Sequence, residues 1–139
     1  ISLGLVGSEM CIRDSSISDF VYSDSKWLGF IINQIIFNSI KYCSDKPPVI
    51  QIKSKDMGDY VTLSITDNGI GIKPSEVNRV FDKGFVGSNG RMRKKSTGIG
   101  LYLCDQLCLK LGIGIDIESE VGCYTTVLLH FPKSNHLNV

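Results

Sequence analysis

Three polar side chains form a stripe on an otherwise apolar segment. Gln34, Asn38 and Lys41 follow one another at intervals of four and three residues, which places them on one face of a helix, with Tyr42 beside them. The amide oxygen of Asn38 is a hard ligand of the kind that Mg²⁺ prefers, and the ammonium group of Lys41 can neutralise phosphate charge. The stripe alone is also consistent with a solvated helix face that carries two amides and a lysine.

A carboxylate follows a strand-like run at the sequence Asp-Asn-Gly-Ile-Gly-Ile, residues 67–72. Three apolar residues of the run share one face, and Asp67 continues that face by the period of two, so its carboxylate is directed toward the core side. A carboxylate in that position needs a donor, and the amino group of adenine is one. Gly69 and Gly71 lack a Cβ, which lets a base approach the backbone closely. A plain Asp-Asn-Gly turn is the alternative.

A glycine-rich segment at residues 82–97 leads into the sequence Ser-Thr-Gly-Ile-Gly-Leu, residues 96–101, at the start of a helical pattern. A flexible basic loop can close over a triphosphate, and the free amides at a helix N-terminus suit phosphate. An exposed basic loop and a glycine-hinged junction are the alternatives. Neither a Walker loop nor a G-x-G-x-x-G fingerprint occurs in the sequence. The cations of the segment are Lys83, Arg91, Arg93, Lys94 and Lys95.

These motifs require elements that hold them in place. Helical spacing predicts helices at residues 27–43, 74–80 and 98–111, the first of them capped by Asp24 or Ser25. Alternation of apolar and polar residues predicts strands at residues 17–23, 49–53, 60–66, 113–118 and 124–131. This order of elements predicts an α+β two-layer sandwich, in which the helices cover one face of a mixed sheet.

Composition restricts the function further. The 139 residues fit one domain, and a net charge of +1 gives no reason to expect binding to nucleic acid or to a membrane surface. No apolar run approaches the roughly 18–20 residues that a membrane span needs. The five cysteines contain no C-x-x-C pair, and Cys104 and Cys108 share a helix face without two further zinc ligands nearby. Reduced thiols in a cytosolic domain are therefore the favoured interpretation.

In their order and spacing, the motifs resemble those of the GHKL superfamily, which comprises gyrase, Hsp90, histidine kinase and MutL type ATPases. QIIFNSIKY is similar to the N box, DNGIGI to the first glycine box, VFDKGF to the F box and STGIGL to the second glycine box. The N and F boxes resemble those of histidine kinases, and the longer strings around them resemble the transporter-associated, antimicrobial-peptide (bacitracin)-sensing subclass. The resemblance covers roughly residues 16–133 and implies the Bergerat fold.

The resemblance implies a role for each matched residue. Asn38 would coordinate Mg²⁺ on the phosphates of ATP, Lys41 would contact phosphate, and Asp67 would accept a hydrogen bond from the adenine amino group. Gyrase-like and Hsp90-like relatives place a glutamate base where this chain has Gln34, and an amide cannot take a proton from water. The remaining implied nucleotide contacts are Tyr42, Gly69, Gly71, Ile72, Phe81, Thr97, Gly98, Gly100, Leu101 and Thr125, with Arg91 and Lys95 as cations of the lid. Tyr124 replaces the glycine that usually precedes the threonine, which puts the role of Thr125 in doubt.

The implied parent protein is a histidine kinase anchored in the bacterial cell membrane, with this domain in the cytoplasm. It would transfer the γ-phosphoryl group of ATP to a histidine on a dimerisation domain and then to a response regulator, and an ABC transporter is a further implied partner. Neither His130 nor His136 lies in a helical dimerisation segment. A water-using ATPase switch and a non-catalytic nucleotide-sensing module are the alternatives.

The two ends of the chain are expected to lie outside the domain at residues 16–133. Residues 1–15 resemble a translated adapter or vector sequence, with a native linker as the alternative. Residues 134–139 are expected to form a tail.

Overall fold

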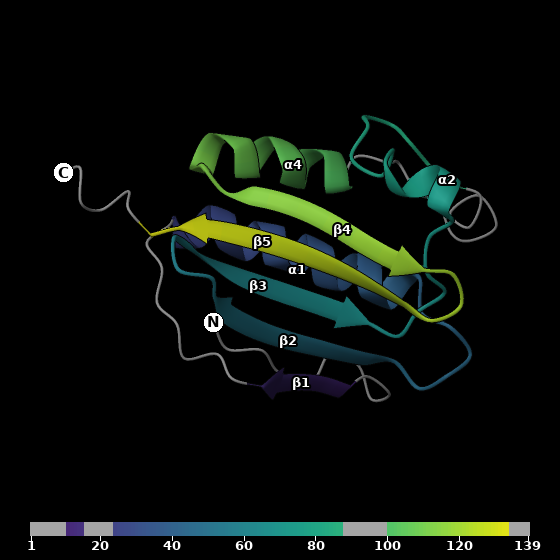
Figure 1. The fold of residues 1–139 in the computed structure, drawn as a ribbon. Helices are drawn as coiled ribbons and strands as arrows, with labels where there is room; N and C mark the ends of the chain where they lie inside the picture. Colours follow the sequence, from purple (N-terminus) through teal and green to yellow (C-terminus); the bar gives the residue numbers. More distant parts are fainter. Residues whose placement is uncertain (1–10, 16–23, 88–99, 134–139) are drawn as a thin grey trace.

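The computed structural model describes residues 11–15, 24–87 and 100–133, and it consists of a five-stranded sheet and three helices (Figure 1). The strands are β1 (Cys11–Ser15), β2 (Val49–Asp56), β3 (Tyr60–Asp67), β4 (Gly114–Glu120) and β5 (Tyr124–Pro132). The helices are α1 (Ser25–Lys41), α2 (Pro74–Val77) and α4 (Gly100–Leu111).

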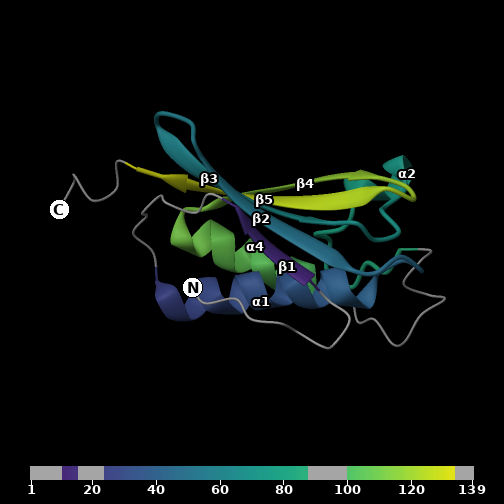
Figure 2. The ribbon, with the colours of Figure 1, turned by 90° about the horizontal axis from the view of Figure 1, so that it is seen from below.

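The sheet is mixed, as predicted. Its order is β1-β2-β3-β5-β4, in which β1 runs parallel to β2 and every other neighbouring pair is antiparallel. The long helices α1 and α4 lie side by side on the same face of this sheet (Figure 2). The predicted two-layer α+β sandwich is therefore confirmed.

The polar stripe of the sequence lies on α1, which begins two residues before the predicted start at residue 27 and ends at Lys41, two residues before the predicted end. The carboxylate of Asp24 caps the helix and accepts hydrogen bonds from the backbone amides of Lys26 and Trp27 at 3.0 and 3.2 Å. The opposite side of the helix is buried in the core, where each isoleucine is at most 6% exposed: Ile31, Ile32, Ile35 and Ile36. The helix is therefore fixed by its apolar side, and its polar residues are left at the end nearest the loops.

The helix α4 packs against α1, and its two cysteines belong to the shared core. Cys104 and Cys108 are fully buried, and burial raises the pKa of the Cys104 thiol to about 12 and that of the Cys108 thiol to about 11. Both thiols therefore stay protonated at neutral pH and pack as small apolar groups. They meet an apolar sheet face formed by Ile50, Ile52, Ile65, Val127 and Leu129.

Several predicted boundaries differ from the structure. The strand expected at residues 17–23 lies outside the described residues, whereas β1 lies within residues 1–15, the segment expected to be non-native or a linker. Cys11 of β1 pairs with Val49 of β2, so this segment adds an edge strand, and its origin stays a prediction. The short helix expected at residues 74–80 ends at Val77. Within the described residues, no helix has the length and hydrophobicity to span a membrane.

Candidate functional site

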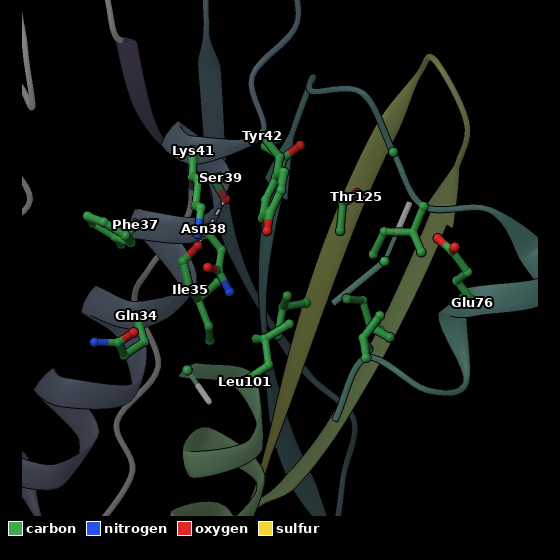
Figure 3. Close-up of a pocket in the computed structure, with 18 of the residues that line it drawn as sticks. Gln34, Ile35, Phe37, Asn38, Ser39, Lys41, Tyr42, Glu76, Leu101 and Thr125 are labelled. Carbon is green, nitrogen blue, oxygen red and sulfur yellow. Dashed lines mark hydrogen bonds between the residues drawn. The ribbon is translucent and has the colours of Figure 1, made fainter. Parts of the chain in front are cut away.

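A cavity of about 290 Å³ lies where α1, α2 and α4 meet the sheet (Figure 3). Segments far apart in the sequence line it, including the C-terminal part of α1, the end of β3 with the loop after it, and the start of β5. Ten residues singled out from the sequence are among those that line it: Gln34, Asn38, Lys41, Tyr42, Asp67, Gly71, Ile72, Gly100, Leu101 and Thr125. The motifs therefore converge on one site.

The polar stripe of α1 faces this cavity. Figure 3 shows Asn38, Lys41 and Tyr42 together on one side of the cavity, with Thr125 on the other. The ammonium group of Lys41 lies 5.6 Å from the centre of the Tyr42 ring, within the range of a cation–π contact. The stripe thus combines an amide oxygen, a cation and an aromatic surface in one turn, and the alternative of a merely solvated face is disfavoured.

Asp67 ends β3 and is directed into the cavity as its alternation predicted. The backbone amide of Gly69 donates a hydrogen bond to its Oδ1 at 2.9 Å. Burial raises the pKa of the Asp67 carboxyl, although hydrogen bonds from Gly69, Ser39 and the Thr125 backbone oppose this shift. Burial therefore makes the charged form of this carboxylate unfavourable, and a hydrogen-bond donor on a ligand would stabilise it. A perturbed carboxyl group in a cavity is typical of a binding site.

The other lining residues make the cavity mainly apolar apart from the stripe and Asp67. None of them was among the implied contact residues. Five lie within the N and F boxes, between or beside the matched residues, and the other five lie in α2, β4, β5 or the loop after the F box, which carry no motif of their own. A mainly apolar pocket with one buried acceptor and a cation and an amide among its lining residues suits a heteroaromatic base joined to an anionic group. These unpredicted lining residues are Ile35, Phe37, Ser39, Glu76, Val80, Phe85, Val86, Gly87, Ile117 and Val127.

Two of the residues with an implied nucleotide contact do not line the cavity. Gly69 does not line the cavity: its backbone packs under the end of α1, where an added Cβ would lie 2.5 Å from the Tyr42 carbonyl oxygen. Phe81 does not line it either, because turns at Asp82 and Phe85 wind the chain so that Phe85 lines the cavity instead. The positions of Arg91, Lys95, Thr97 and Gly98 lie outside the described residues.

Gly71 joins the loop after β3 to the end of β4. Its φ is +73°, and an added Cβ would overlap the backbone carbonyl group of Glu120. Gly71→Ala should therefore lower the free energy of unfolding by roughly 2–3 kcal/mol, from backbone strain together with overpacking. Gly58→Ala is the matched control, since Gly58 has φ +97° but no described atom within 4 Å of its added Cβ. It should cost only about 1 kcal/mol. Urea unfolding measures both, and equal losses would contradict the close packing of Gly71 on β4.

The donor set fits Mg²⁺ held jointly with phosphates. Among the described residues, no three His, Cys, Asp or Glu side chains gather into a group that could hold a metal ion. Mg²⁺ does not need such a group, because it keeps several waters and takes one or two protein oxygens together with substrate phosphates. The side chain of Asn38 can supply one such oxygen at the rim of the cavity.

Comparison with known proteins gives one family and several relatives. Residues 23–135 match the family described as "Histidine kinase-, DNA gyrase B-, and HSP90-like ATPase". The chain is 44% identical over 115 residues to the sensor protein BceS of Bacillus subtilis, covering 83% of this chain and 34% of BceS. It is 42% identical over 117 residues to the sensor histidine kinase GraS of Staphylococcus haemolyticus, covering 84% of this chain and 33% of GraS. The chain therefore spans about a third of the length of these curated relatives.

Solved structures share the fold. The mycobacterial sensor histidine kinase MprB superposes with a TM-score of 0.77 at 22% identity, covering 90% of this chain and 84% of that one. The catalytic domain of the histidine kinase ThkA superposes with a TM-score of 0.71 at 21% identity, covering 90% of this chain and 80% of that one. At such identities the likeness concerns the arrangement of helices and strands.

Proposed function

Because the chain belongs to the family of histidine kinase-, DNA gyrase B- and HSP90-like ATPases, we propose that it is the ATP-binding catalytic domain of a two-component sensor histidine kinase. In the complete protein, the γ-phosphoryl group of ATP passes to a histidine on a separate dimerisation domain, which leaves ADP in the cavity. The phosphoryl group then passes to an aspartate of a response regulator. Support for the kinase comes from BceS and GraS, which are named sensor proteins.

The observation that carries this proposal is the convergence of the motifs on one cavity. Asn38 and Lys41 reach it from α1, Asp67 from the end of β3, and Gly100 from the start of α4. Adenine then occupies the apolar part beside Asp67 and Tyr42, and the phosphates extend toward Lys41 and the amides at the start of α4. Mg²⁺, when bound at Asn38, neutralises phosphate charge.

The chain contributes to phosphoryl transfer by positioning and by charge neutralisation, since little covalent chemistry falls to the protein in such reactions. Lys41 and Asn38 hold the phosphate end, while Asp67 fixes the base. Gly98, Thr97 and the lid cations Arg91 and Lys95 are proposed to complete the phosphate site. Gly69 acts on the site indirectly, through the hydrogen bond that its amide donates to Asp67.

Phosphotransfer is preferred over a water-using ATPase switch because of Gln34. Gln34 lines the cavity one turn before Asn38, at the sequence position where the gyrase-like and Hsp90-like relatives place a glutamate base. A neutral amide cannot accept a proton from water near neutral pH. The proposed acceptor of the phosphoryl group is therefore a histidine outside this domain.

The similarity to BceS and GraS also supports a proposal for the complete protein. We propose that the complete protein belongs to the transporter-associated, antimicrobial-peptide (bacitracin)-sensing subclass of these kinases. It would be anchored in the bacterial cell membrane, with this domain in the cytoplasm. An ABC transporter is the proposed partner of the membrane part.

The proposed function predicts Mg²⁺-dependent binding of adenine nucleotides by this chain. Calorimetry with ADP and with a non-hydrolysable ATP analogue should show binding below about 1 mM, tighter with Mg²⁺ than with a chelator. The control is Asp56→Asn, at the end of β2, where the carboxylate pairs with Lys133 away from the cavity, and it should bind as the unmodified chain does. If neither nucleotide is bound at millimolar concentration, the proposed function is wrong.

A further inference from the structure

The hydroxyl group of Ser119, near the end of β4, makes three hydrogen bonds beside the cavity, on the same sheet face as its cross-strand partner Thr125. Its Oγ accepts from the backbone amide of Ile72 at 2.8 Å and donates to the carbonyl oxygen of Tyr124 at 2.7 Å. It also lies 2.9 Å from Oγ1 of Thr125. Ser119 does not line the cavity, but Ile72 and Thr125 do. This half-buried serine therefore acts on the site only through its neighbours.

The chemistry of these partners determines the direction of every bond. A serine hydroxyl has one hydrogen and two acceptor positions. The amide of Ile72 can only donate and the carbonyl of Tyr124 can only accept, so these two use one acceptor position and the single hydrogen of Ser119. The contact with Thr125 is then possible in one direction, in which the Thr125 hydroxyl donates to Ser119.

Thr125 consequently has no hydroxyl hydrogen left for a ligand. Its oxygen keeps lone pairs, so toward the cavity this side chain acts as an acceptor. The backbone partner of Thr125 across the sheet is Asp67, whose ionised carboxylate is also only an acceptor. Directly paired residues present their side chains on the same face of a sheet. Two acceptors therefore face the same part of the cavity.

We infer that Ser119 is a positioning residue for base selectivity, since it fixes Thr125 as an acceptor beside Asp67. A ligand group that faces this pair, directly or through a bridging water, has to donate. The exocyclic amino group of adenine carries two hydrogens, whereas hypoxanthine and guanine carry a carbonyl oxygen at the same ring position. This inference rests on the proposed adenine site. It adds Ser119 as the residue that orients Thr125, one of the two acceptors at that site.

The test compares ADP with inosine diphosphate, which carries hypoxanthine, by calorimetry on the full chain. The quantity measured is the ratio of the two dissociation constants. In Ser119→Ala the Thr125 hydroxyl can turn its hydrogen toward the cavity, so the preference for ADP should fall by about fivefold or more. Thr125→Val removes the acceptor without loosening Ile72 and should lower the preference by a similar factor. Ser119→Thr keeps the hydroxyl and should keep the preference.

The double variant separates positioning from a merely structural role. If Ser119 acts through Thr125, the double variant with Ser119→Ala and Thr125→Val should have the same ratio of ADP to inosine diphosphate dissociation constants as Thr125→Val alone. Equal weakening of both nucleotides by Ser119→Ala, with an unchanged ratio, would overturn the inference. So would an unchanged ratio in Thr125→Val, a result that remains available even if Ser119→Ala does not fold. Failure of the unmodified chain to bind ADP would instead overturn the proposed function.

Discussion

Asp67→Asn is expected to weaken adenine nucleotide binding by about 1–3 kcal/mol, which is roughly a 5- to 150-fold rise in the dissociation constant. The ionised carboxylate only accepts, whereas an asparagine side chain can turn its own donors toward the adenine amino group. The loss should concern the base more than the phosphates, because Lys41 and Asn38 reach the cavity from a different element. Calorimetry with ADP measures the loss, and inorganic triphosphate should bind the variant and the unmodified chain alike.

The same substitution should not reduce the stability of the nucleotide-free domain near neutral pH. Burial raises the pKa of Asp67 in the folded state, so the folded chain keeps this proton to a higher pH than the unfolded chain does. Stability therefore falls as the pH rises from the ordinary value of 3.8 through the raised pKa. The amide has no such titration, and we expect a Tm at neutral pH that equals or exceeds that of the unmodified chain.

Asp56→Asn is the control for this pH dependence, because the pKa of Asp56 is lowered in the folded state whereas that of Asp67 is raised. The ammonium group of Lys133, 2.6 Å from Asp56, is the main cause that lowers the pKa of this exposed carboxyl. The contribution of Asp56 to stability is therefore lost as the pH falls, and its removal should leave ADP binding unchanged. If Asp67→Asn and the unmodified chain bind ADP with equal affinity, Asp67 does not contact adenine and its assignment is wrong.

Asn38→Ala is expected to separate Mg²⁺ from nucleotide binding. ADP should still bind, because Asp67 and Tyr42 are unchanged, but the gain in affinity from Mg²⁺ should fall since the side-chain oxygen at the phosphate end is gone. In a longer protein that includes the histidine-bearing domain, phosphohistidine formation from ATP should fall at least about 100-fold, because charge neutralisation of the phosphates depends on the ion. Calorimetry with and without Mg²⁺ and a phosphotransfer assay measure the two effects.

Gln34 is the residue that could substitute for Asn38, since it lies one turn earlier on α1. Its Oε1, however, lies close to the start of α4, 3.0 Å from the point where a Cβ on Gly100 would stand. We therefore expect Gln34→Ala alone to leave the Mg²⁺ dependence largely intact. If Asn38→Ala keeps both Mg²⁺ dependence and phosphotransfer while the double variant with Gln34→Ala loses them, the metal ligand is Gln34, and the assignment along α1 is wrong by one turn.

Family membership could be predicted from the sequence because its signals are local. The four boxes occur in order within residues 34–101, and the match to the ATPase family confirms the predicted resemblance. The stripe on α1 followed from the helical period, and the inward direction of Asp67 followed from the period of two in β3. Each depends only on neighbours a few residues away, and backbone geometry makes those relations the same in every helix or strand.

Tertiary structure alone decided which segments meet. The replacement of the usual glycine by Tyr124 made Thr125 doubtful in the sequence, yet the position of β5 between β3 and β4 makes Thr125 the partner of Asp67. The same register brings Ser119 beside Thr125. Strand order and register depend on packing between segments more than 50 residues apart, as between Asp67 and Thr125, and no local period encodes them.

Which aromatic side chain lines the cavity was also decided by tertiary structure. The family resemblance implied a contact from Phe81, the first aromatic residue of the F box. The structure places Phe85 at the cavity, with the guanidinium of Arg79 4.5 Å from its ring centre. The choice depends on the turns after α2, whose hydrogen bonds link Arg79, Asp82 and Phe85. The sequence thus determined which chemical groups the site has, and the packing of distant segments determined which of them face one another.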